Sequence, residues 1–325
     1  MDPRLFLADL EAKPESLRRL AATLADGDVW HGLPDPVDRV LLLGMGSSRY
    51  AAEMAALRLR AAGVDAIAEY ASAAATCPPG PRTLVVAISA SGTSQETLDA
   101  ADRYQGSGRL VALTNAPDSP LADVADLVVP MHAGAETGGV ACRTFQHTLV
   151  LLLDLAARLS TRTAAADLGR PDVAGLARRA ADASEDLLAR RDEWLTAADA
   201  LLDGPHGVHA LAPVERLSSA MQSALMVREG PRRPAVGCET GDWSHVDVYL
   251  TKTLDYRALL FPGSRYDAPA LDWLRQRRST VLAVGAEVAG AAAVIRYHGD
   301  DDPGVRLLTE TLVAELVAAR WWSRS

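Results

Sequence analysis

The sequence has 325 residues, enough for two domains of ordinary size, and its 49% hydrophobic and 23% charged residues are typical of a globular protein with a large core. A formal net charge of −9, without basic runs, argues against nucleic acid as a main partner. There is no basic-then-apolar leader and no apolar stretch of membrane-spanning length, so we expect a soluble, cytoplasmic protein without a membrane partner.

Periodic apolar residues predict a helical arm over residues 3–24 at the N-terminus. After this arm, apolar runs alternate with helix-type segments. The runs predict strands at residues 40–43, 65–69, 83–89, 109–114 and 127–130, and the segments predict helices at residues 51–62, 94–104, 119–125 and 143–159. Strands and helices that alternate at this spacing indicate βαβ units with right-handed crossovers, and therefore a parallel sheet.

The second half repeats this alternation. Residues 161–202 lack the Gly, Ser and Pro density of a flexible linker, so we interpret them as a helical connection. Strands are then predicted at residues 207–212, 257–261, 280–284 and 293–297, helices at residues 214–228 and 307–322, and a loop at residues 230–246. We therefore predict an α/β fold with two tandem domains, each a parallel sheet flanked by helices in three αβα layers. The predicted domains are residues 1–165, which include the arm, and residues 204–325, joined by a helical connection at residues 166–203.

Two predicted strands of the first half end in turns rich in glycine and hydroxyl groups. The first turn contains Gly44, Gly46, Ser47 and Ser48, and the second contains Ser89, Ala90, Ser91, Gly92, Thr93 and Ser94. Because a helix follows each turn, backbone N–H groups, hydroxyls and the positive end of a helix dipole can all face one anion, and a phosphate fits this chemistry best. An ordinary capped strand-to-helix turn is the alternative for either segment alone. A dinucleotide fingerprint is disfavoured, because Arg49 stands where its third glycine is needed.

In this order and about forty residues apart, the two turns resemble those of the SIS (sugar isomerase) domain, a phosphosugar-binding α/β module. A third segment, Ala133 to Phe145, resembles Ala-Gly-Thr-Glu-x-Gly-Val-Ala-Ser-Thr-Lys-x-Phe of the same family, in particular of the isomerase half of glucosamine-6-phosphate synthase and its stand-alone relatives. The resemblance implies that Ser47, Ser48, Ser89, Ala90, Ser91 and Ser94 bind the phosphate and that Gly46, Gly139 and Glu136 lie at the sugar. Glu136 orienting the backbone of its own segment is an equal alternative. Gly139 and Ala141 replace the family's Val and Ser at sugar-contacting positions.

The helix predicted at residues 214–228 runs into Glu229, before Gly230 and Pro231. A carboxylate at a helix C-terminus faces the negative end of the helix dipole, which raises its pKa and suits a general base. A surface ion pair with Arg228 or Arg232 is the alternative role for Glu229.

The resemblance assigns Glu229 the proton transfer between C1 and C2 of the sugar. It assigns His245, sixteen residues later, assistance in ring opening from a neighbouring subunit, which implies a homodimer. Capping or stacking with Trp243 is the alternative for His245. The family's lysine three residues before the Glu falls on Met226, and its C-terminal lysine tail and glutaminase domain have no counterpart in this sequence.

The remaining polar residues of interest have structural interpretations. His147 lies on an apolar helix face and is predicted to be a packed core or dimer-contact residue. Asp300, Asp301 and Asp302 are predicted to form a solvated acidic turn, because they lack the ligand spacing of a metal site. The three cysteines form no Cys-x-x-Cys pair and no metal-ligand spacing, so we predict no metal site. We also predict no organic cofactor, because one base and a pocket that stabilises an enediolate suffice for the chemistry that the resemblance implies.

The sequence thus indicates an enzyme that isomerises a sugar phosphate, either by aldose–ketose isomerisation or by isomerisation or deamination of an amino-sugar phosphate. Removal of an amino acid from a glycated sugar phosphate is a further possibility for the same chemistry. One base and a pocket that stabilises an enediolate suffice for this chemistry. A non-catalytic phosphosugar-binding sensor is the alternative, favoured by Met226 at the lysine position. A pathway enzyme acting on an unusual sugar or cyclitol phosphate is a third interpretation.

Overall fold

The computed structural model describes residues 1–160 and 171–324, and its chain divides into two compact units. The first-sheet unit comprises Ser16–Ala135 and Arg143–Ala177, and the second-sheet unit comprises Met1–Glu15, Glu136–Cys142 and Arg178–Ser325. The predicted boundary at residues 165 and 166 lies outside the described residues. Each unit contains one parallel sheet with helices, which confirms the predicted α/β class and its two sheets.

The first sheet has five parallel strands in the order β2-β1-β3-β4-β5. Its strands are β1 (Arg39–Gly44), β2 (Asp65–Tyr70), β3 (Thr83–Ile88), β4 (Arg109–Thr114) and β5 (Leu127–Pro130). Its helices are α2 (Lys13–Asp26), α3 (Gly46–Ala61), α4 (Gln95–Asp102), α5 (Pro120–Val124) and α6 (Arg143–Ser160). All of these strands lie within a few residues of their predicted positions.

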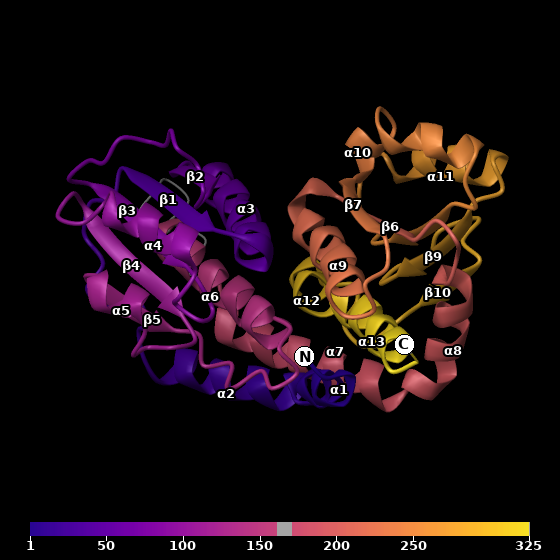
Figure 1. Cartoon of the computed structure of the whole chain (residues 1–325), viewed down its shortest axis with the longest axis horizontal. Coiled ribbons are helices and arrows are strands. Elements are labelled where there is room, and N and C mark those ends of the chain that lie inside the picture. The colour runs from indigo at the N-terminus through magenta and orange to yellow at the C-terminus, as the bar shows by residue number, and fades with distance from the viewer. Residues whose placement is uncertain (161–170, 325) are drawn as a thin grey trace. The chain divides into compact units, whose positions relative to one another are not determined.

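Both faces of the first sheet are buried, as continuous apolar strands require. Leu41 and Val85 pack with residues of α4 and α5 in one core cluster. Their neighbours Leu42 and Val86 are also fully buried and point to the opposite face. Helices α3 and α6 pack together there, with α3 against β1 and β2 (Figure 1). This arrangement gives the predicted three layers.

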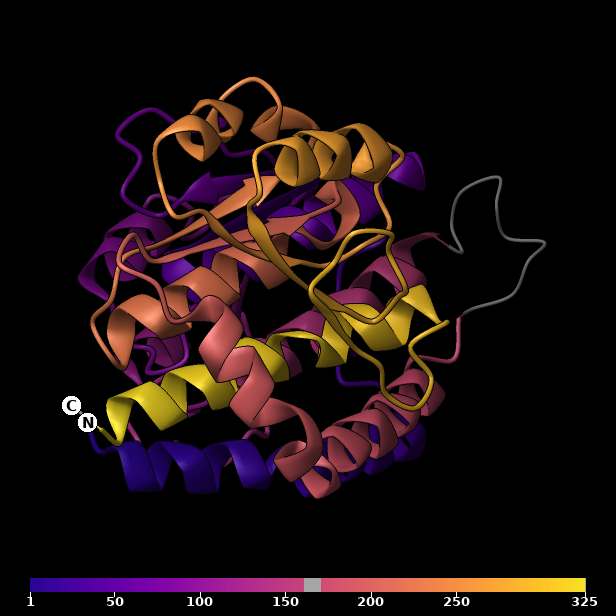
Figure 2. The same cartoon turned by 90° about the vertical axis from the view of Figure 1, so that its right-hand side faces the viewer.

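The second sheet has the order β10-β9-β8-β6-β7 and is also parallel. Its strands are β6 (Val208–Ala212), β7 (Ala235–Glu239), β8 (Arg257–Leu260), β9 (Thr280–Val284) and β10 (Ala293–Ile295). The helices of this half of the chain are α7 (Val173–Ala189), α8 (Arg191–Leu202), α9 (Leu217–Glu229), α10 (Thr240–Trp243), α11 (Asp267–Gln276), α12 (Pro303–Thr309) and α13 (Thr311–Trp322), with 3-10 helices at Val214–Arg216 and Asp247–Lys252. Helix α1 (Pro3–Glu11) packs against α13, so that both termini lie together (Figures 1 and 2).

The predicted loop at residues 230–246 is wrong in part, because it contains the edge strand β7 and helix α10. The strand was not predicted because Pro234 and Gly237 are residue types that indicate turns. Gly237 is required by packing, because a Cβ atom there would lie 2.8 Å from the backbone of Ala220 in α9. No helix was predicted from the sequence at the residues of α11.

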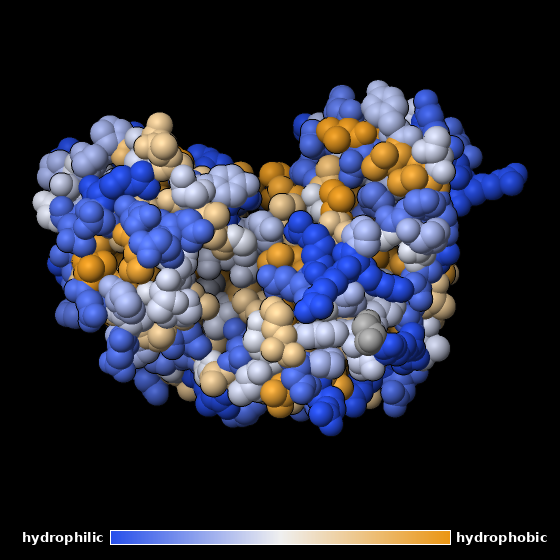
Figure 3. All heavy atoms as spheres, viewed as in Figure 1, coloured by the Kyte–Doolittle hydropathy of each residue, from blue (hydrophilic) through white to orange (hydrophobic). Residues whose placement is uncertain are grey.

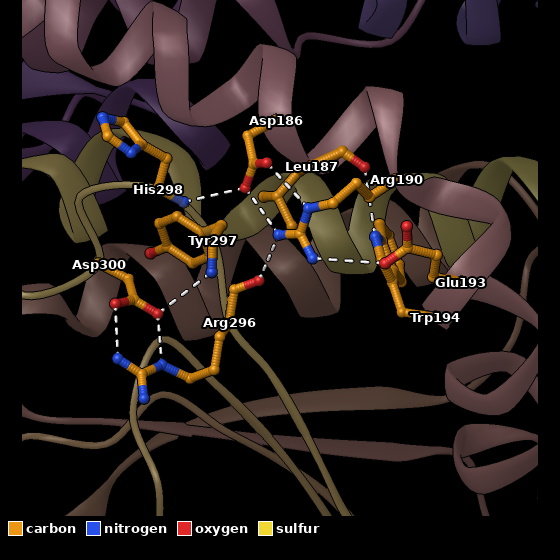
Figure 4. A network of polar contacts seen from close by, with 9 residues as sticks. All are labelled: Asp186, Leu187, Arg190, Glu193, Trp194, Arg296, Tyr297, His298 and Asp300. Atoms are coloured by element: carbon orange, nitrogen blue, oxygen red, sulfur yellow. Dashed lines mark hydrogen bonds and ion pairs between the residues drawn. The ribbon is translucent and has the colours of Figure 1, made fainter.

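The acidic turn at Asp300 is not simply solvated (Figure 4). Asp300 is buried, and its carboxylate accepts hydrogen bonds from Arg296 Nε at 2.6 Å and Nη2 at 2.7 Å. Asp302 caps α12 by accepting the Gly304 N–H at 2.7 Å. In the same network Asp186 of α7 accepts hydrogen bonds from Arg190 and from the backbone N–H of His298. These carboxylates therefore fix the chain that leaves β10.

Within the described residues, no helix has both the length and the apolar character needed to cross a membrane.

Candidate functional site

The two hydroxyl-rich turns follow neighbouring parallel strands, β1 and β3, and therefore lie at the same carboxyl edge of the first sheet. The chain passes to β2 on one side of β1 and to β3 on the other, so this edge is the topological switch point of the sheet. Open α/β sheets bind ligands in the crevice at that point. The structure thus brings together the residues predicted to bind phosphate: Ser47 and Ser48 at the start of α3, and Ser89, Ala90, Ser91 and Ser94 before α4.

Glycine at two positions allows these turns to form. Gly46 has φ +50° and Gly92 has φ +64°, a region that residues with a Cβ atom rarely adopt. A Cβ atom on Gly92 would lie 1.9 Å from Ser119 Oγ and 2.4 Å from Ser119 Cβ. The second turn therefore lies directly against the buried Ser119 at the start of α5.

Hydrogen bonds link two hydroxyl groups of the second turn to each other and a third to the first residues of α4. Ser91 Oγ lies 2.9 Å from Thr93 Oγ1, and Ser94 Oγ donates to the Glu96 carboxylate at 2.9 Å and accepts from Thr97 Oγ1 at 3.2 Å. Ser91 is exposed and Ser94 is half-buried. With the start of α4 behind them, they form a cradle suited to an oxyanion. We call residues 44–48 and 89–94 the phosphate cradle.

The third segment, Ala133 to Phe145, is divided between the two units. Its residues 136–142 belong to the second-sheet unit, and the residues before and after them belong to the first-sheet unit. Glu136 Oε1 accepts the backbone N–H of Cys142 at 2.7 Å, which closes this segment into a loop. Glu136 therefore orients the backbone, one of its two predicted roles. Gly139 is exposed with φ +75°, and Ala141 is half-buried. We call residues 136–142 the third-motif loop.

Two residues that hold the third-motif loop were not predicted from the sequence. Asp9 of α1 accepts the Gly138 N–H at 2.7 Å, and Gln222 of α9 donates from Nε2 to the Ala141 carbonyl at 2.8 Å. Both side chains are buried. A signal for Asp9 exists, because it shares the apolar face of α1 with Phe6 and Leu10. Gln222 carries no comparable signal, since α9 is rich in small and polar residues throughout.

Glu229 is the last residue of α9 and is half-buried. Burial raises the pKa of its carboxyl group, and the neighbouring Arg228 partly opposes this shift. The direction agrees with the expectation from the helix terminus, but burial is the main cause. Among the interactions of the described residues, no ion pair joins Glu229 to Arg228 or Arg232. Met226, at the family's lysine position, is fully buried.

His245 lies after α10 and is exposed. The indole of Trp243 donates to the Tyr256 hydroxyl at 2.8 Å, and its ring lies edge-on to that of Tyr256 with centroids 6.3 Å apart. Helix α9 returns from the carboxyl end of β6 to the amino end of β7. Glu229 therefore lies near the amino ends of the strands of the second sheet, and His245 lies near their carboxyl ends. The five residues of β7 span about 17 Å. The structure therefore does not bring these two side chains together within one chain.

His147 of α6 is a packed core residue, as predicted. Its Nδ1 lies 2.8 Å from the Met131 carbonyl and its Nε2 lies 3.0 Å from Ser16 Oγ. Burial lowers its pKa from 6.5 to about 4. Within residues 1–160 and 171–324, no group of three or more His, Cys, Asp or Glu side chains is arranged to hold a metal ion.

Comparisons with known proteins agree with the observed fold. Residues 36–158 match the family model of the SIS domain. The glutamine–fructose-6-phosphate aminotransferase (isomerizing) of Aeropyrum pernix is 28% identical over 258 residues, which are 77% of this chain and 42% of that protein. The chain thus spans about two fifths of the length of this curated relative.

Two solved structures share the whole fold. The C-terminal domain of glucosamine-fructose-6-phosphate aminotransferase from Francisella tularensis superposes with a TM-score of 0.83 at 17% identity, covering 98% of this chain and 96% of that one. Tagatose-6-phosphate ketose/aldose isomerase from Escherichia coli gives 0.75 at 16% identity, covering 98% and 92%. The chain therefore shares the fold of these proteins, and its residues 36–158 are similar to the SIS domain.

Proposed function

We propose that this protein is a phosphosugar isomerase acting on a hexose phosphate or an amino-sugar phosphate. The observation that carries the proposal is the phosphate cradle, two hydroxyl-rich turns at the switch point of the first sheet. Its Ser47, Ser48, Ser89 and Ser91 hydroxyls and the amides around Ala90 and Ser94 bind the phosphoryl oxygens. The net charge of −9 does not attract an anion, so local dipoles must hold the phosphate.

In the proposed reaction Glu229 is the general base. Its carboxylate removes the proton at C2 of the open-chain aldose, and the electron pair forms the C1–C2 double bond of an enediolate. Glu229, now protonated, returns the proton to C1 while a proton passes from the C2 hydroxyl to the oxygen on C1, which leaves a hydroxyl at C1 and a ketone at C2. The raised pKa of a half-buried carboxyl group suits both steps, since the group must gain and lose the proton. For a 2-amino sugar the same steps give an imine at C2, which water converts to a ketone with release of ammonia.

A homodimer is part of the proposal, because His245 and Glu229 lie at opposite edges of one sheet. His245 of a second copy then assists the ring opening. The surface around His245 has apolar side chains, including Val246 at 54%, Tyr249 at 61% and Leu250 at 37% exposure. Apolar side chains also gather over α10 and α11 in the space-filling view (Figure 3). A subunit contact would bury this surface.

A non-catalytic phosphosugar-binding protein is the second candidate, and Met226 favours it. This fully buried side chain stands where the SIS resemblance places a lysine and has no proton to exchange. Gln222 Nε2 lies 3.6 Å from Met226 Sδ, so an amide and a thioether fill the space beside the base.

Proton exchange separates the two candidates. The protein is incubated in deuterium oxide with fructose 6-phosphate or glucosamine 6-phosphate, and deuterium at C1 and C2 is measured by NMR. An isomerase incorporates deuterium into the sugar phosphate that it converts, and Glu229→Gln abolishes the incorporation while sugar-phosphate binding persists. Binding by the wild type without deuterium incorporation would identify a sensor and refute the catalytic assignment.

A further inference from the structure

The third-motif loop is fixed to the second-sheet unit from two sides. On the side of α1, the buried Asp9 carboxylate accepts the Gly138 N–H at 2.7 Å, and the Asp2 N–H donates to the Gly138 carbonyl at 3.4 Å. A Cβ atom on Gly138 would lie 2.5 Å from the backbone of Phe6. The loop therefore rests on the backbone of α1 with no room for a side chain at residue 138.

The Phe6 ring continues this contact toward the end of α9. Its centroid lies 5.9 Å from that of Trp322, the last residue of α13. A Cβ atom on Gly230, which follows Glu229, would lie 3.1 Å from the Trp322 ring. Helix α1, the end of α13 and the end of α9 thus form one continuous packed region.

On the other side, Gln222 holds the loop to α9 itself. Its amide is fully buried and donates to the Ala141 carbonyl at 2.8 Å. Gln222, Met226 and Glu229 occupy positions i, i+4 and i+7, so they share one face of α9. Along the helix axis Gln222 and Glu229 are about 10 Å apart. The loop is therefore attached to the helix face that ends in the proposed base.

We propose that Asp9 and Gln222 are positioning residues that hold the third-motif loop in register with Glu229. The inference rests on the proposed function, in which the loop contacts the sugar. Neither residue touches the reacting atoms. They act by fixing Gly139 and Ala141 relative to α9, so that the C1–C2 end of the sugar meets the carboxylate. Phosphate binding itself depends on the cradle in the first-sheet unit and not on this loop.

The test uses Asp9→Ala, Asp9→Asn and Gln222→Met in the full chain. Asp9→Ala removes the acceptor for the Gly138 N–H, whereas the amide oxygen of Asn keeps it. Glu11→Gln is the matched control on α1, because Glu11 pairs with Arg191 on the surface. Ser223→Ala is the control on α9, because it changes a similarly buried residue whose hydroxyl group makes no hydrogen bond to the described residues. Urea unfolding of each variant shows which ones remain folded.

Three quantities are measured: kcat with fructose 6-phosphate, the preference for fructose 6-phosphate over inorganic phosphate in calorimetry, and deuterium exchange of the loop amides by mass spectrometry. Asp9→Ala and Gln222→Met should lower kcat by about tenfold to a hundredfold, the range expected for a misplacement of about 1 Å. They should reduce the preference for the sugar phosphate, leave the Kd of inorganic phosphate within about twofold, and speed exchange of the loop amides. Asp9→Asn and both controls should behave like the wild type.

Unchanged exchange in Asp9→Ala, or unchanged kcat and preference in a variant whose loop exchange has risen, would overturn the inference. Failure of the proposed function has a different signature, because the wild type itself would then show no turnover of, and no deuterium incorporation into, fructose 6-phosphate or glucosamine 6-phosphate. In that case the inference is overturned together with the function it rests on, even where the exchange data show that the loop is held.

Discussion

The replacement Gly92→Ala tests the geometry of the phosphate cradle, and its cost follows from two separate effects. The first is conformational: an L-residue at φ +64° costs about 1–2 kcal/mol. The second is steric, because the new Cβ atom would lie 2.4 Å from Ser119 Cβ, which no rotation of the Ser119 side chain can move. Overpacking of this kind costs about 1–3 kcal/mol. The free energy of unfolding of Gly92→Ala should therefore fall by about 2–5 kcal/mol.

Gly106→Ala provides the control, because Gly106 has φ +70° but no atom within 4 Å of a Cβ atom there. It should lose only the conformational part, about 1–2 kcal/mol. Adding Ser119→Gly to Gly92→Ala removes the opposing Cβ atom and should recover part of the steric cost. Urea unfolding measures the free energy of unfolding of each variant, and calorimetry measures the Kd of inorganic phosphate. This Kd should rise in Gly92→Ala and in neither of the other two variants. Equal losses of stability in Gly92→Ala and Gly106→Ala would refute the close approach of the turn to Ser119.

Three further predictions concern ionisable groups. Because burial raises the pKa of Glu229 and the base acts in its deprotonated form, kcat/KM should fall on the acidic side at a higher pH than for an exposed Glu. His147 has a pKa of about 4 in the folded protein against 6.5 ordinarily, so it stays neutral in the folded protein where the unfolded chain binds a proton. The free energy of unfolding should therefore decline by about 3 kcal/mol as the pH falls from 6.5 toward 4. In urea unfolding His147→Gln should remove this decline. Lys13 and Glu315 form a buried ion pair between the start of α2 and α13, so Lys13→Met should cost about 3–5 kcal/mol in urea unfolding, and the double replacement Lys13→Met with Glu315→Leu should regain most of it.

Each of these predictions has a contrary outcome. A pH–rate profile whose acidic limb lies at the pKa of an exposed carboxyl group would remove Glu229 from the role of base. Stability of His147→Gln that still declines between pH 6.5 and 4, as in the wild type, would assign the decline to another group. If Lys13→Met and the double replacement were equally unstable, the cost would come from lost packing and not from an unpaired charge.

Most of the fold was predictable because the inner strands of both sheets are almost entirely buried and read as apolar runs. The strand that was not predicted is β7, an edge strand whose Val236 is 46% exposed and whose Gly237 faces the backbone of α9. The sequence of β7 is determined by contact with helix α9 and not by burial inside the sheet, so it does not read as an apolar run. Helix α11 was missed for a related reason, since only Ala270 and Leu274 of it are buried.

The cradle was predictable because its residues are contiguous in the sequence and lie at strand ends, so local sequence determines their chemistry. The roles of Asp9 and Gln222 were not, because residues 129 and 81 positions away from their partners meet only in the folded chain. The separation of Glu229 from His245 likewise depends on the direction of α9 against β7. Sixteen residues of sequence spacing do not indicate that a strand lies between them.

The most direct measurement of the central claim is a crystal structure of the protein with fructose 6-phosphate bound. We predict the phosphoryl oxygens within hydrogen-bonding distance of Ser48, Ser89 and Ser91 and of the first amides of α4. A phosphoryl group bound elsewhere on the protein, with these hydroxyls unoccupied, would contradict the account.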